Sequence, residues 1–390
     1  MNILFVINNL YTKGNGLSGS ARRTIQYLRK TGVAVKTLSA ANPEPQGEQP
    51  DFVLPDDTIP LFHGIIQRQG YAFAKPDAEI IARALQWADV VHLEEPFALQ
   101  WKVVELAERV GVPCVATYHL HPENFFASVH LMWCRYLNNA TMRVWKKKVF
   151  RHCAIVQCPT QNVKDRLERT GLQTELRVIS NGLIPDGRTE GYDTAPEPSS
   201  RFRLLCVGRY SNEKDQVTLL NAMRYCAHAD QIHLVFAGRG PIEKKLRRKA
   251  RQLVRDGFLK IEPSFGFFSY DELMHLAHSS TLYIHCAIIE VEGLSCLEVI
   301  KEGVVPVIAA GPYTATTQFA LNEKSVYPAR DAKALAERID YWLEHPAQRE
   351  ETARQYVSIG KEYDIRRSVG ALVKMYEDAN NRHQSSGIKN

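Results

Sequence analysis

The chain opens with MNILFVI at residues 1–7, NNLYTKGNGLSG at residues 8–19 and SARRTIQYLRK at residues 20–30. The first stretch predicts a buried β-strand, and the third predicts a helix, because its apolar side chains recur at helical spacing. The apolar run at residues 33–38 predicts a second strand. A strand, a helix and another strand in this order indicate a βαβ unit of a parallel sheet.

The same alternation continues through two long stretches of the chain. In the first stretch we expect further strands at residues 90–93, 112–118 and 154–159, with a helix near residues 99–110. In the second we expect strands at residues 202–208, 232–237, 260–261, 282–286 and 304–309, and helices at residues 215–225, 242–254, 270–277, 295–301, 332–343 and 365–380. The pattern predicts an α/β fold with two Rossmann-like, doubly wound halves, whose ligands bind outside the carboxyl ends of the strands.

A polar segment separates the two halves. Residues 186–200 read DGRTEGYDTAPEPSS, a composition typical of an exposed linker. We therefore expect an N-terminal domain over residues 1–185, this linker, and a C-terminal domain over residues 201–362. Residues 363–390 are expected to form a final helix.

Composition excludes several classes of protein. With 45% hydrophobic and 24% charged residues, the chain has globular values rather than those of a disordered or collagen-like protein. No apolar run reaches the ~18 residues that a membrane-spanning helix needs, and the start lacks the basic lead of a signal peptide. The eight cysteines form no C-x-x-C pair, which favours reduced thiols over a zinc site or a disulfide framework. A net charge of +6 is too mild to indicate nucleic acid. We expect a cytoplasmic protein.

The first loop contains a glycine motif. Gly14, Gly16 and Gly19 match G-x-G-x-x-G between a strand and a helix. A dinucleotide site would need an acidic residue about twenty positions on, where residues 39–41 are Ser-Ala-Ala. A nicotinamide or flavin site is therefore disfavoured. We expect Gly16 to let the backbone approach the sugar or phosphate of a ligand, and a plain surface loop is the alternative.

Two cations follow the first strand of the second half. Gly208-Arg209 ends that strand, and Lys214 lies at the entry to the next helix. Cations beside a helix N-terminus suit a diphosphate, whereas an exposed pair without a ligand is the alternative. Gly238 lies in a second glycine turn, AGRGP at residues 237–241, which either accommodates a nucleotide or is a plain turn.

Two carboxylates flank the next glycine turn. Glu290 and Glu298 lie eight residues apart across a loop-to-helix junction formed by Gly293, Leu294 and Ser295. Backbone N–H groups at a helix start suit a phosphate, and carboxylates on either side can hold hydroxyls. The alternative is a capping box, because Ser295 and Glu298 have its spacing.

These motifs resemble those of the retaining glycosyltransferases of family 4, which have the two-domain GT-B fold, and the resemblance covers nearly the whole chain. It rests on the E-x7-E pattern, on Gly303-x-x-Pro306-Val307-Ile308, and on Arg209 and Lys214 upstream. The resemblance implies that Arg209 and Lys214 bind the donor diphosphate, that Glu290 contacts the transferred sugar, that Glu298 binds the ribose, and that backbone at Gly293, Leu294 and Ser295 cradles the phosphates.

The resemblance extends to the first half. Residues 116–119, Ala-Thr-Tyr-His, match the family's strand that ends in a histidine facing the sugar, which points to His119 as a catalytic residue. A structural histidine is the alternative, and His121 and His130 are weaker candidates. Many family members carry Phe where this chain has Glu292, whereas the subgroup that glycosylates diacylglycerol often carries Gln. The resemblance also implies that the final helix crosses back onto the first domain.

The chemistry implied by the family keeps the anomeric configuration of the donor sugar, with attack by the acceptor from the face that the nucleotide diphosphate leaves. A double displacement with Glu290 as nucleophile ranks below this route. The sequence contains no D-x-D, so we expect no metal and no cofactor, since the nucleotide sugar is a substrate.

One segment combines basic and aromatic residues without any acid. Residues 124–164 contain no Asp or Glu, and the membrane or acceptor contacts that we expect within them are Arg143, Trp145, Lys146, Lys147 and Lys148. Such a segment suits an interfacial helix on an anionic membrane, and the alternative is a solvated basic helix that packs on the core. The basic run at residues 244–255 is expected to be a solvated face.

The function expected from the sequence is therefore an α-forming, retaining hexosyltransferase, peripheral on the inner face of the cell membrane. Its donor would be UDP-glucose or UDP-galactose, and its acceptor a lipid such as diacylglycerol, ceramide or a glycolipid. The alternatives are a transferase of polysaccharide or soluble glycoconjugate synthesis, a nucleotide-sugar epimerase, and a non-catalytic sugar-nucleotide-binding protein.

Overall fold

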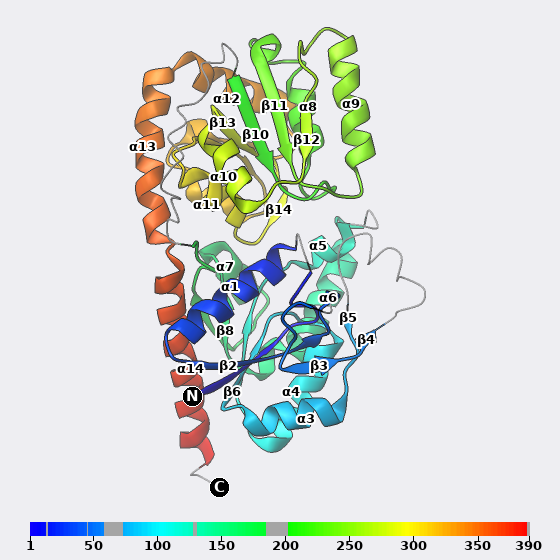
Figure 1. The fold of residues 1–390 in the computed structure, drawn as a ribbon, viewed down its shortest axis with the longest axis vertical. Coiled ribbons are helices and arrows are strands. Elements are labelled where there is room, and N and C mark those ends of the chain that lie inside the picture. The colour runs from blue at the N-terminus through cyan, green and yellow to red at the C-terminus, as the bar shows by residue number, and fades with distance from the viewer. Residues whose placement is uncertain (13–14, 45, 58–72, 128–130, 185–201, 388–390) are drawn as a thin grey trace. The chain divides into compact units, whose positions relative to one another are not determined.

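The computed structural model describes residues 1–12, 15–44, 46–57, 73–127, 131–184 and 202–387. The chain divides into two compact units (Figure 1). Unit 1 comprises Met1–Pro122, Met132–Gly182 and Ile365–Asn390, and unit 2 comprises Glu123–Leu131 and Leu183–Asp364. The linker expected at residues 186–200 lies outside the described residues, as do Gly14 and His130.

Unit 1 is built on a seven-stranded sheet with the order β3-β2-β1-β6-β7-β8-β9, in which every pairing is parallel. Its strands are β1 (Asn2–Val6), β2 (Ala34–Ala40), β3 (Phe52–Leu54), β6 (Val90–Leu93), β7 (Cys114–Thr117), β8 (Cys153–Cys158) and β9 (Glu175–Val178). Its helices are α1 (Gly16–Lys30), α3 (Ala78–Trp87), α4 (Ala98–Val110), α6 (Arg135–Lys148), α7 (Gln161–Arg169) and α14 (Ile365–Gly387), with a short antiparallel pair of β4 (Asp56–Asp57) and β5 (Phe73–Ala74).

Unit 2 repeats this plan with a six-stranded parallel sheet in the order β12-β11-β10-β13-β15-β17. Its strands are β10 (Phe202–Val207), β11 (Ile232–Ala237), β12 (Ser264–Gly266), β13 (Leu282–His285), β15 (Pro306–Ala310) and β17 (Val326–Pro328), and a separate parallel pair is formed by β14 (Ile289–Glu290) and β16 (Tyr313–Thr314). Its helices are α8 (Gln216–Ala222), α9 (Glu243–Arg255), α10 (Tyr270–His278), α11 (Leu294–Ile300), α12 (Ala332–Glu344) and α13 (Pro346–Glu362), and α5 (Pro122–Ala127) lies mostly in the segment that clusters with this unit.

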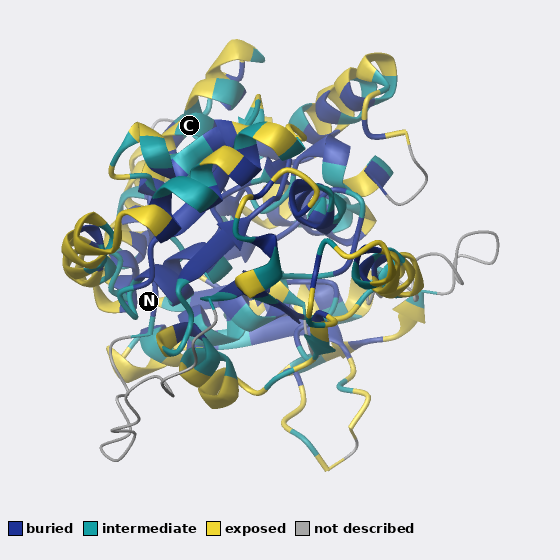
Figure 2. Cartoon of the chain, turned by 90° about the horizontal axis from the view of Figure 1, so that it is seen from above, coloured by how far each residue is buried: buried dark blue, intermediate teal, exposed yellow. Residues whose placement is uncertain are grey.

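The sheets form the cores of both units. Figure 2 shows strands that are almost wholly buried and surface helices that carry a buried stripe and an exposed face. The run Ile3–Ile7 is fully buried, as expected for a parallel strand that is covered on both faces. The expectation of two Rossmann-like α/β halves is confirmed.

Helix α14 joins the core of unit 1 although more than 180 residues separate it from β9. Its buried residues recur at helical spacing and pack with those of β1: Ile365, Val369, Leu372, Met375, Tyr376 and Ala379. The end of the chain thus supplies one of the helices that cover the first sheet.

Several expected boundaries differ from those of the structure, and α14 ends at Gly387 rather than at residue 380. Helix α1 begins at Gly16 rather than near residue 20, because the side chain of Asn15 caps the helix by accepting from the N–H of Leu17. Gly16 therefore lies in the first turn of a helix, with open space beside its Cα. The strand expected at residues 260–261 instead occupies Ser264–Gly266. Helix α8 ends at Ala222, three residues before the expected end.

The glycine turn after β11 has a packing role. A Cβ on Gly238, whose φ is +157°, would lie 2.1 Å from the carbonyl oxygen of Gly208. A Cβ on Gly240 would lie 2.4 Å from the carbonyl oxygen of Tyr210. The two glycines let the loop after β11 pack against the loop after β10, which carries Arg209.

Each sheet changes direction at one pair of neighbouring strands. In unit 1 the chain builds outward from β1 through β2 to β3 and then continues on the other side with β6. In unit 2 it builds from β10 through β11 to β12 and continues on the other side with β13. Ligands of open α/β sheets bind beside the carboxyl ends of such strand pairs. The candidate sites are therefore expected after β1 and β6 and after β10 and β13.

Candidate functional site

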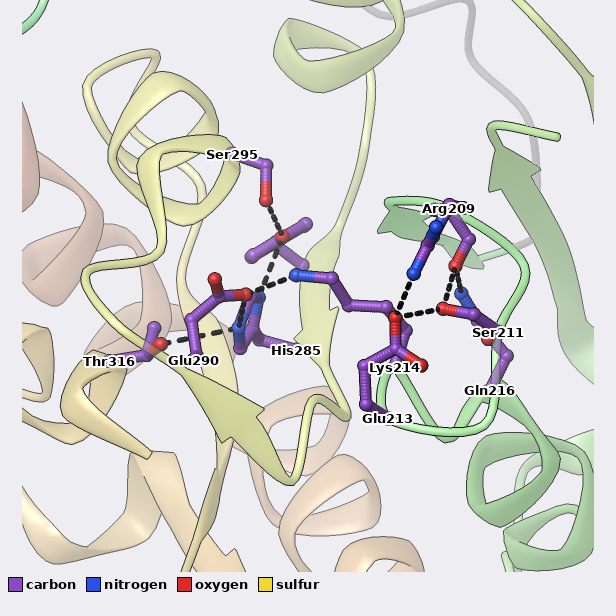
Figure 3. A network of polar contacts seen from close by, with 10 residues as sticks. Arg209, Ser211, Glu213, Lys214, Gln216, His285, Glu290, Ser295 and Thr316 are labelled. Atoms are coloured by element: carbon purple, nitrogen blue, oxygen red, sulfur yellow. Dashed lines mark hydrogen bonds and ion pairs between the residues drawn. The ribbon is translucent and has the colours of Figure 1, made fainter. Parts of the chain in front are cut away.

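An ion pair between Lys214 and Glu290 lies in unit 2 beyond β10 and β13, the two neighbouring strands at which the sheet changes direction (Figure 3). Lys214 follows β10, and Glu290 is the last residue of β14, which follows β13. The side chains of Lys214 and Glu290 are only 24% and 16% exposed. The structure thus brings together a cation and an acid that the sequence placed in separate motifs.

The carboxyl group of Glu290 stays ionised because of its neighbours. Burial acts to raise its pKa, but Lys214 and His285 outweigh burial and hold the pKa at about 2. The Nε2 atom of His285 lies 3.5 Å from Oε2 of Glu290. At neutral pH, Glu290 is therefore an anion that is held by a cation and an imidazole.

The imidazole of His285 is itself fixed by contacts within unit 2. Its Nδ1 lies 3.0 Å from the hydroxyl of Tyr283, and its Nε2 lies 3.2 Å from Oγ1 of Thr316 (Figure 3). Burial lowers the pKa of His285, so the ring is neutral at neutral pH. A carboxylate near Nε2 favours the tautomer that carries its proton on that nitrogen. Sequence reasoning missed His285, because nothing in an apolar strand marks one histidine as functional.

Arg209 is held by a second buried acid. Its Nη2 lies 2.6 Å from Oε1 of Glu213, and the same oxygen accepts from Oγ of Ser211 at 2.6 Å. Burial acts to raise the pKa of Glu213, but Arg209 and these hydrogen bonds lower it overall. Gln216 donates to the carbonyl of Arg209 at 2.8 Å. The guanidinium, whose side chain is 34% exposed, is therefore held in a fixed place after β10.

Helix α11 does not begin with the capping box that was the alternative for Ser295 and Glu298. Its N-cap is Gly293, with φ of +91° and no side-chain capping bond. A Cβ on Gly293 would lie 2.7 Å from Oγ1 of Thr316, so only glycine fits there. Leu294, Ser295 and Glu298 are partly exposed, and Oγ of Ser295 lies 3.4 Å from the hydroxyl of Tyr283.

The catalytic histidine expected in unit 1 is paired with an acid. His119 lies just after β7, and its Nε2 is 2.5 Å from Oε2 of Glu94, which directly follows β6. The two side chains are 8% and 4% exposed. Burial acts to raise the pKa of Glu94, but His119 and His92 lower it overall. Sequence reasoning missed Glu94, although its place after β6, at the point where this sheet changes direction, is a usable signal. Of the weaker candidates, His121 is fully buried and contacts Tyr118.

The five expected membrane or acceptor contacts of the basic and aromatic segment lie on helix α6, and only some of them are at the surface. Arg143, Lys147 and Lys148 are exposed. Lys146 is partly buried and donates to the carbonyl of Thr170. Trp145 is 3% exposed and packs edge to face on Phe97, with the ring centroids 5.9 Å apart. The expectation that Trp145 contacts a membrane is therefore wrong, because this ring belongs to the core. In the described part of residues 124–164, the exposed aromatic residues are Phe125, Trp133 and Tyr136.

Within the described ranges, no group of three or more His, Cys, Asp and Glu side chains could hold a metal ion. None of the helices in those ranges is both long and apolar enough to cross a bilayer.

Replacing Lys214 by Met should change how stability depends on pH. Wild-type Glu290, with a pKa of about 2 against an ordinary 4.5, stabilises the fold above pH 4.5 and loses this contribution as the pH falls towards 2. Without its cation the buried carboxyl should have a raised pKa, so the folded variant gains stability as the pH falls. We expect a deficit in unfolding free energy of about 3 kcal/mol at pH 7 that shrinks towards pH 5.

Melting temperatures of both proteins across this pH range measure the effect. The matched control is Lys260→Met, which removes an exposed ion pair with Asp230 and should cost little at any pH. A deficit of the Lys214→Met variant that stays constant or grows as the pH falls contradicts the account.

Comparison with known proteins gives the family. Residues 14–186 match the family model "Glycosyltransferase Family 4", and residues 193–362 match "Glycosyl transferases group 1". An alpha-monoglucosyldiacylglycerol synthase of Streptococcus pneumoniae is 26% identical over 329 residues, covering 80% of this chain and 72% of the relative. A GDP-mannose-dependent alpha-mannosyltransferase of Mycolicibacterium smegmatis is 24% identical over 299 residues, covering 72% of this chain and 75% of the relative.

A solved structure shares the fold. Anabaena Alr3699/HepE in complex with UDP has a TM-score of 0.75 and 16% identity, covering 97% of this chain and 100% of that chain. Together the two family models span both Rossmann-like units. The chain is therefore a glycosyltransferase with the GT-B fold, whose N-terminal half belongs to family 4 and whose C-terminal half belongs to group 1.

Proposed function

We propose that the protein is a retaining hexosyltransferase that moves a sugar from a nucleotide diphosphate sugar to a membrane lipid. The observation that carries this proposal is a pair of cations that follow the same strand, Arg209 held by the buried acid Glu213 and Lys214 held by the buried acid Glu290. Two cations beside an acid suit a ligand that joins a pyrophosphate to a hydroxyl-rich ring.

The donor end of the reaction is assigned to unit 2. Arg209 and Lys214 bind the pyrophosphate, and the three N–H donors of Lys214 allow it to contact a phosphate oxygen while it stays near Glu290. Glu290 accepts from hydroxyls of the hexose, and Glu298 accepts from the ribose. Leu294 and Ser295, at the start of α11, lie between these two acids in the sequence.

The reaction breaks the bond between the anomeric carbon and the donor phosphate oxygen. The acceptor oxygen bonds to the same face of the sugar, and the acceptor proton passes to the departing phosphate. The cations stabilise the negative charge that develops on the leaving group, without a metal. His119 of unit 1 contacts the transferred hexose.

A lipid acceptor is supported by two observations. The relative from Streptococcus pneumoniae is named for a product that is a glycolipid. Helix α6 exposes Arg143, Lys147 and Lys148, and each basic residue near an anionic surface contributes about 1 kcal/mol of attraction. The protein would act as a peripheral protein on the inner face of the cell membrane. The relative from Mycolicibacterium smegmatis is named for GDP-mannose, which is a second candidate donor. The donor experiment below distinguishes GDP-mannose from the UDP sugars.

The donor assignment is tested with UDP-glucose, UDP-galactose and GDP-mannose, a lipid extract, and mass spectrometry of the products. We expect a hexosyl lipid from one UDP sugar. Arg209→Ala and Lys214→Ala should each lower kcat/KM about 10- to 100-fold, because each removes a charge-assisted hydrogen bond. Lys260→Ala, a surface lysine of the same unit, should leave it unchanged. Full turnover by both site variants would contradict the assignment of the pyrophosphate.

The membrane surface is tested by sedimentation with vesicles that contain phosphatidylglycerol. The triple variant Arg143→Gln, Lys147→Gln, Lys148→Gln should bind on the order of 100-fold more weakly than wild type. The matched control removes three exposed charges from α9 with Lys244→Gln, Arg248→Gln and Arg251→Gln, and should bind like wild type. Equal loss in both triple variants would mean a general charge effect, and failure of the wild type to bind at low salt would remove the support for a lipid surface.

A further inference from the structure

Two adjacent glutamates, Glu94 and Glu95, are each 3% exposed beside the end of β6, and their partners differ in kind. Glu95 has a structural task, because it accepts from the backbone N–H of Asn8 at 2.6 Å and from Nδ2 of Asn8 at 2.7 Å. It therefore ties the end of β1 to the end of β6. Glu94 instead directs its two oxygens at two histidines, with Oε2 2.5 Å from Nε2 of His119 and Oε1 3.4 Å from Nε2 of His92.

The orientation of His92 follows from a chain of hydrogen bonds. Nε2 of Gln157 donates to the carbonyl of Ile179 at 2.9 Å, so Oε1 of Gln157 accepts from the hydroxyl of Thr117 at 2.6 Å. That hydroxyl must then accept from Nε2–H of His92 at 2.7 Å, which leaves Nδ1 of His92 to accept from the hydroxyl of Tyr376 at 2.7 Å. Burial lowers the pKa of His92 to about 4, so this ring is neutral at neutral pH.

The Nε2–H of His92 is therefore donated to Thr117, while the same nitrogen lies 3.4 Å from Oε1 of Glu94, and Tyr376 of helix α14 holds the ring in this orientation. The groups that can titrate around Glu94 come from three elements: His92 on β6, His119 after β7 and Tyr376 on α14. His92 and His119 each direct a ring nitrogen at the carboxylate of Glu94, and Tyr376 holds the ring of His92. An ionised carboxylate at this depth costs several kcal/mol unless it is paired, and Glu94 has its pairing partner in His119.

We infer that Glu94 is a positioning residue for His119. It accepts the Nε2–H of His119, fixes the ring, and leaves Nδ1 as the nitrogen that meets the hexose. Among the described residues, no hydrogen-bond partner of that Nδ1 is found. The inference rests on the proposed function, in which His119 contacts the transferred sugar, and adds which atom does so and what holds it.

The pairing with Glu94 fixes the tautomer and the orientation of the His119 ring, which contact with a sugar alone would not do. A free imidazole exchanges its proton between two nitrogens and rotates about two side-chain bonds. With Nε2–H committed to Glu94, the ring presents one defined nitrogen in one orientation. Misplacement of a reactive group by about 1 Å can cost on the order of 100-fold in rate.

A double-mutant cycle tests the inference. Glu94→Ala should lower kcat on the order of 100-fold. His119→Ala should lower it at least as much, and the double variant should be no slower than His119→Ala, because Glu94 acts only through His119. The dissociation constant for UDP should stay within about twofold in all three, because the diphosphate contacts belong to unit 2. Glu105→Ala, which removes an exposed acid paired with Lys102 and Arg109, is the control that should match wild type.

Two conservative variants keep the test decisive if Glu94→Ala folds poorly. Glu94→Gln retains the shape and an accepting oxygen and should recover part of the lost kcat, and Tyr376→Phe should lower kcat by a smaller factor with unchanged UDP affinity. Nitrogen NMR of the His119 ring should show a single Nε2–H tautomer in the wild type and a mixture of tautomers in Glu94→Ala.

Additive losses in the double variant, or an unchanged tautomer in Glu94→Ala, would overturn the inference. Failure of the wild type itself to transfer a hexose would instead overturn the proposed function. The two failures are therefore distinguishable.

Discussion

The ion pair between Lys214 and Glu290 is the interaction on which the site depends. Taking two charges out of water is costly, and either charge alone would be more costly still. The loops that follow β10 and β13 must therefore stay together, although 75 residues separate Lys214 from Glu290 in the chain. Because parallel strands end at the same edge of a sheet, this constraint is met at the point where the sheet of unit 2 changes direction. Under the proposed function, the donor phosphate meets a cation that is already in place.

Both units use the same device with different residues. In unit 1, Glu94 holds His119 just beyond the ends of β6 and β7. In unit 2, Glu213 holds Arg209 just beyond the end of β10. In each pair a buried acid whose pKa is lowered by its partner fixes a basic side chain that keeps some exposure. The acids do not need to touch a substrate to matter, because they determine where the basic groups lie.

The sequence predicted the parts of the fold that depend on continuous apolar runs, and it predicted less of the local polar structure. The strands were predicted from their apolar runs, and Arg209 and Lys214 were predicted from the motif that resembles the family. Glu94 and Glu213 were missed, because the sequence does not show that an acid in the loop after a strand is buried, and such residues are usually at the surface. Trp145 was misjudged for the opposite reason. Helical spacing shows that a side chain lies on an apolar face, but not whether protein or lipid covers that face. The start of α1 was misplaced because Asn15, a good N-cap, precedes two glycines that suggested a loop.

A crystal structure of the protein with UDP bound tests the central claim most directly. We expect the pyrophosphate to contact Arg209 and Lys214 and the ribose hydroxyls to contact Glu298, with Glu290 beside the β-phosphate, where the hexose of the donor would be attached. A pyrophosphate bound elsewhere in the chain, with these side chains left out of contact, would contradict it.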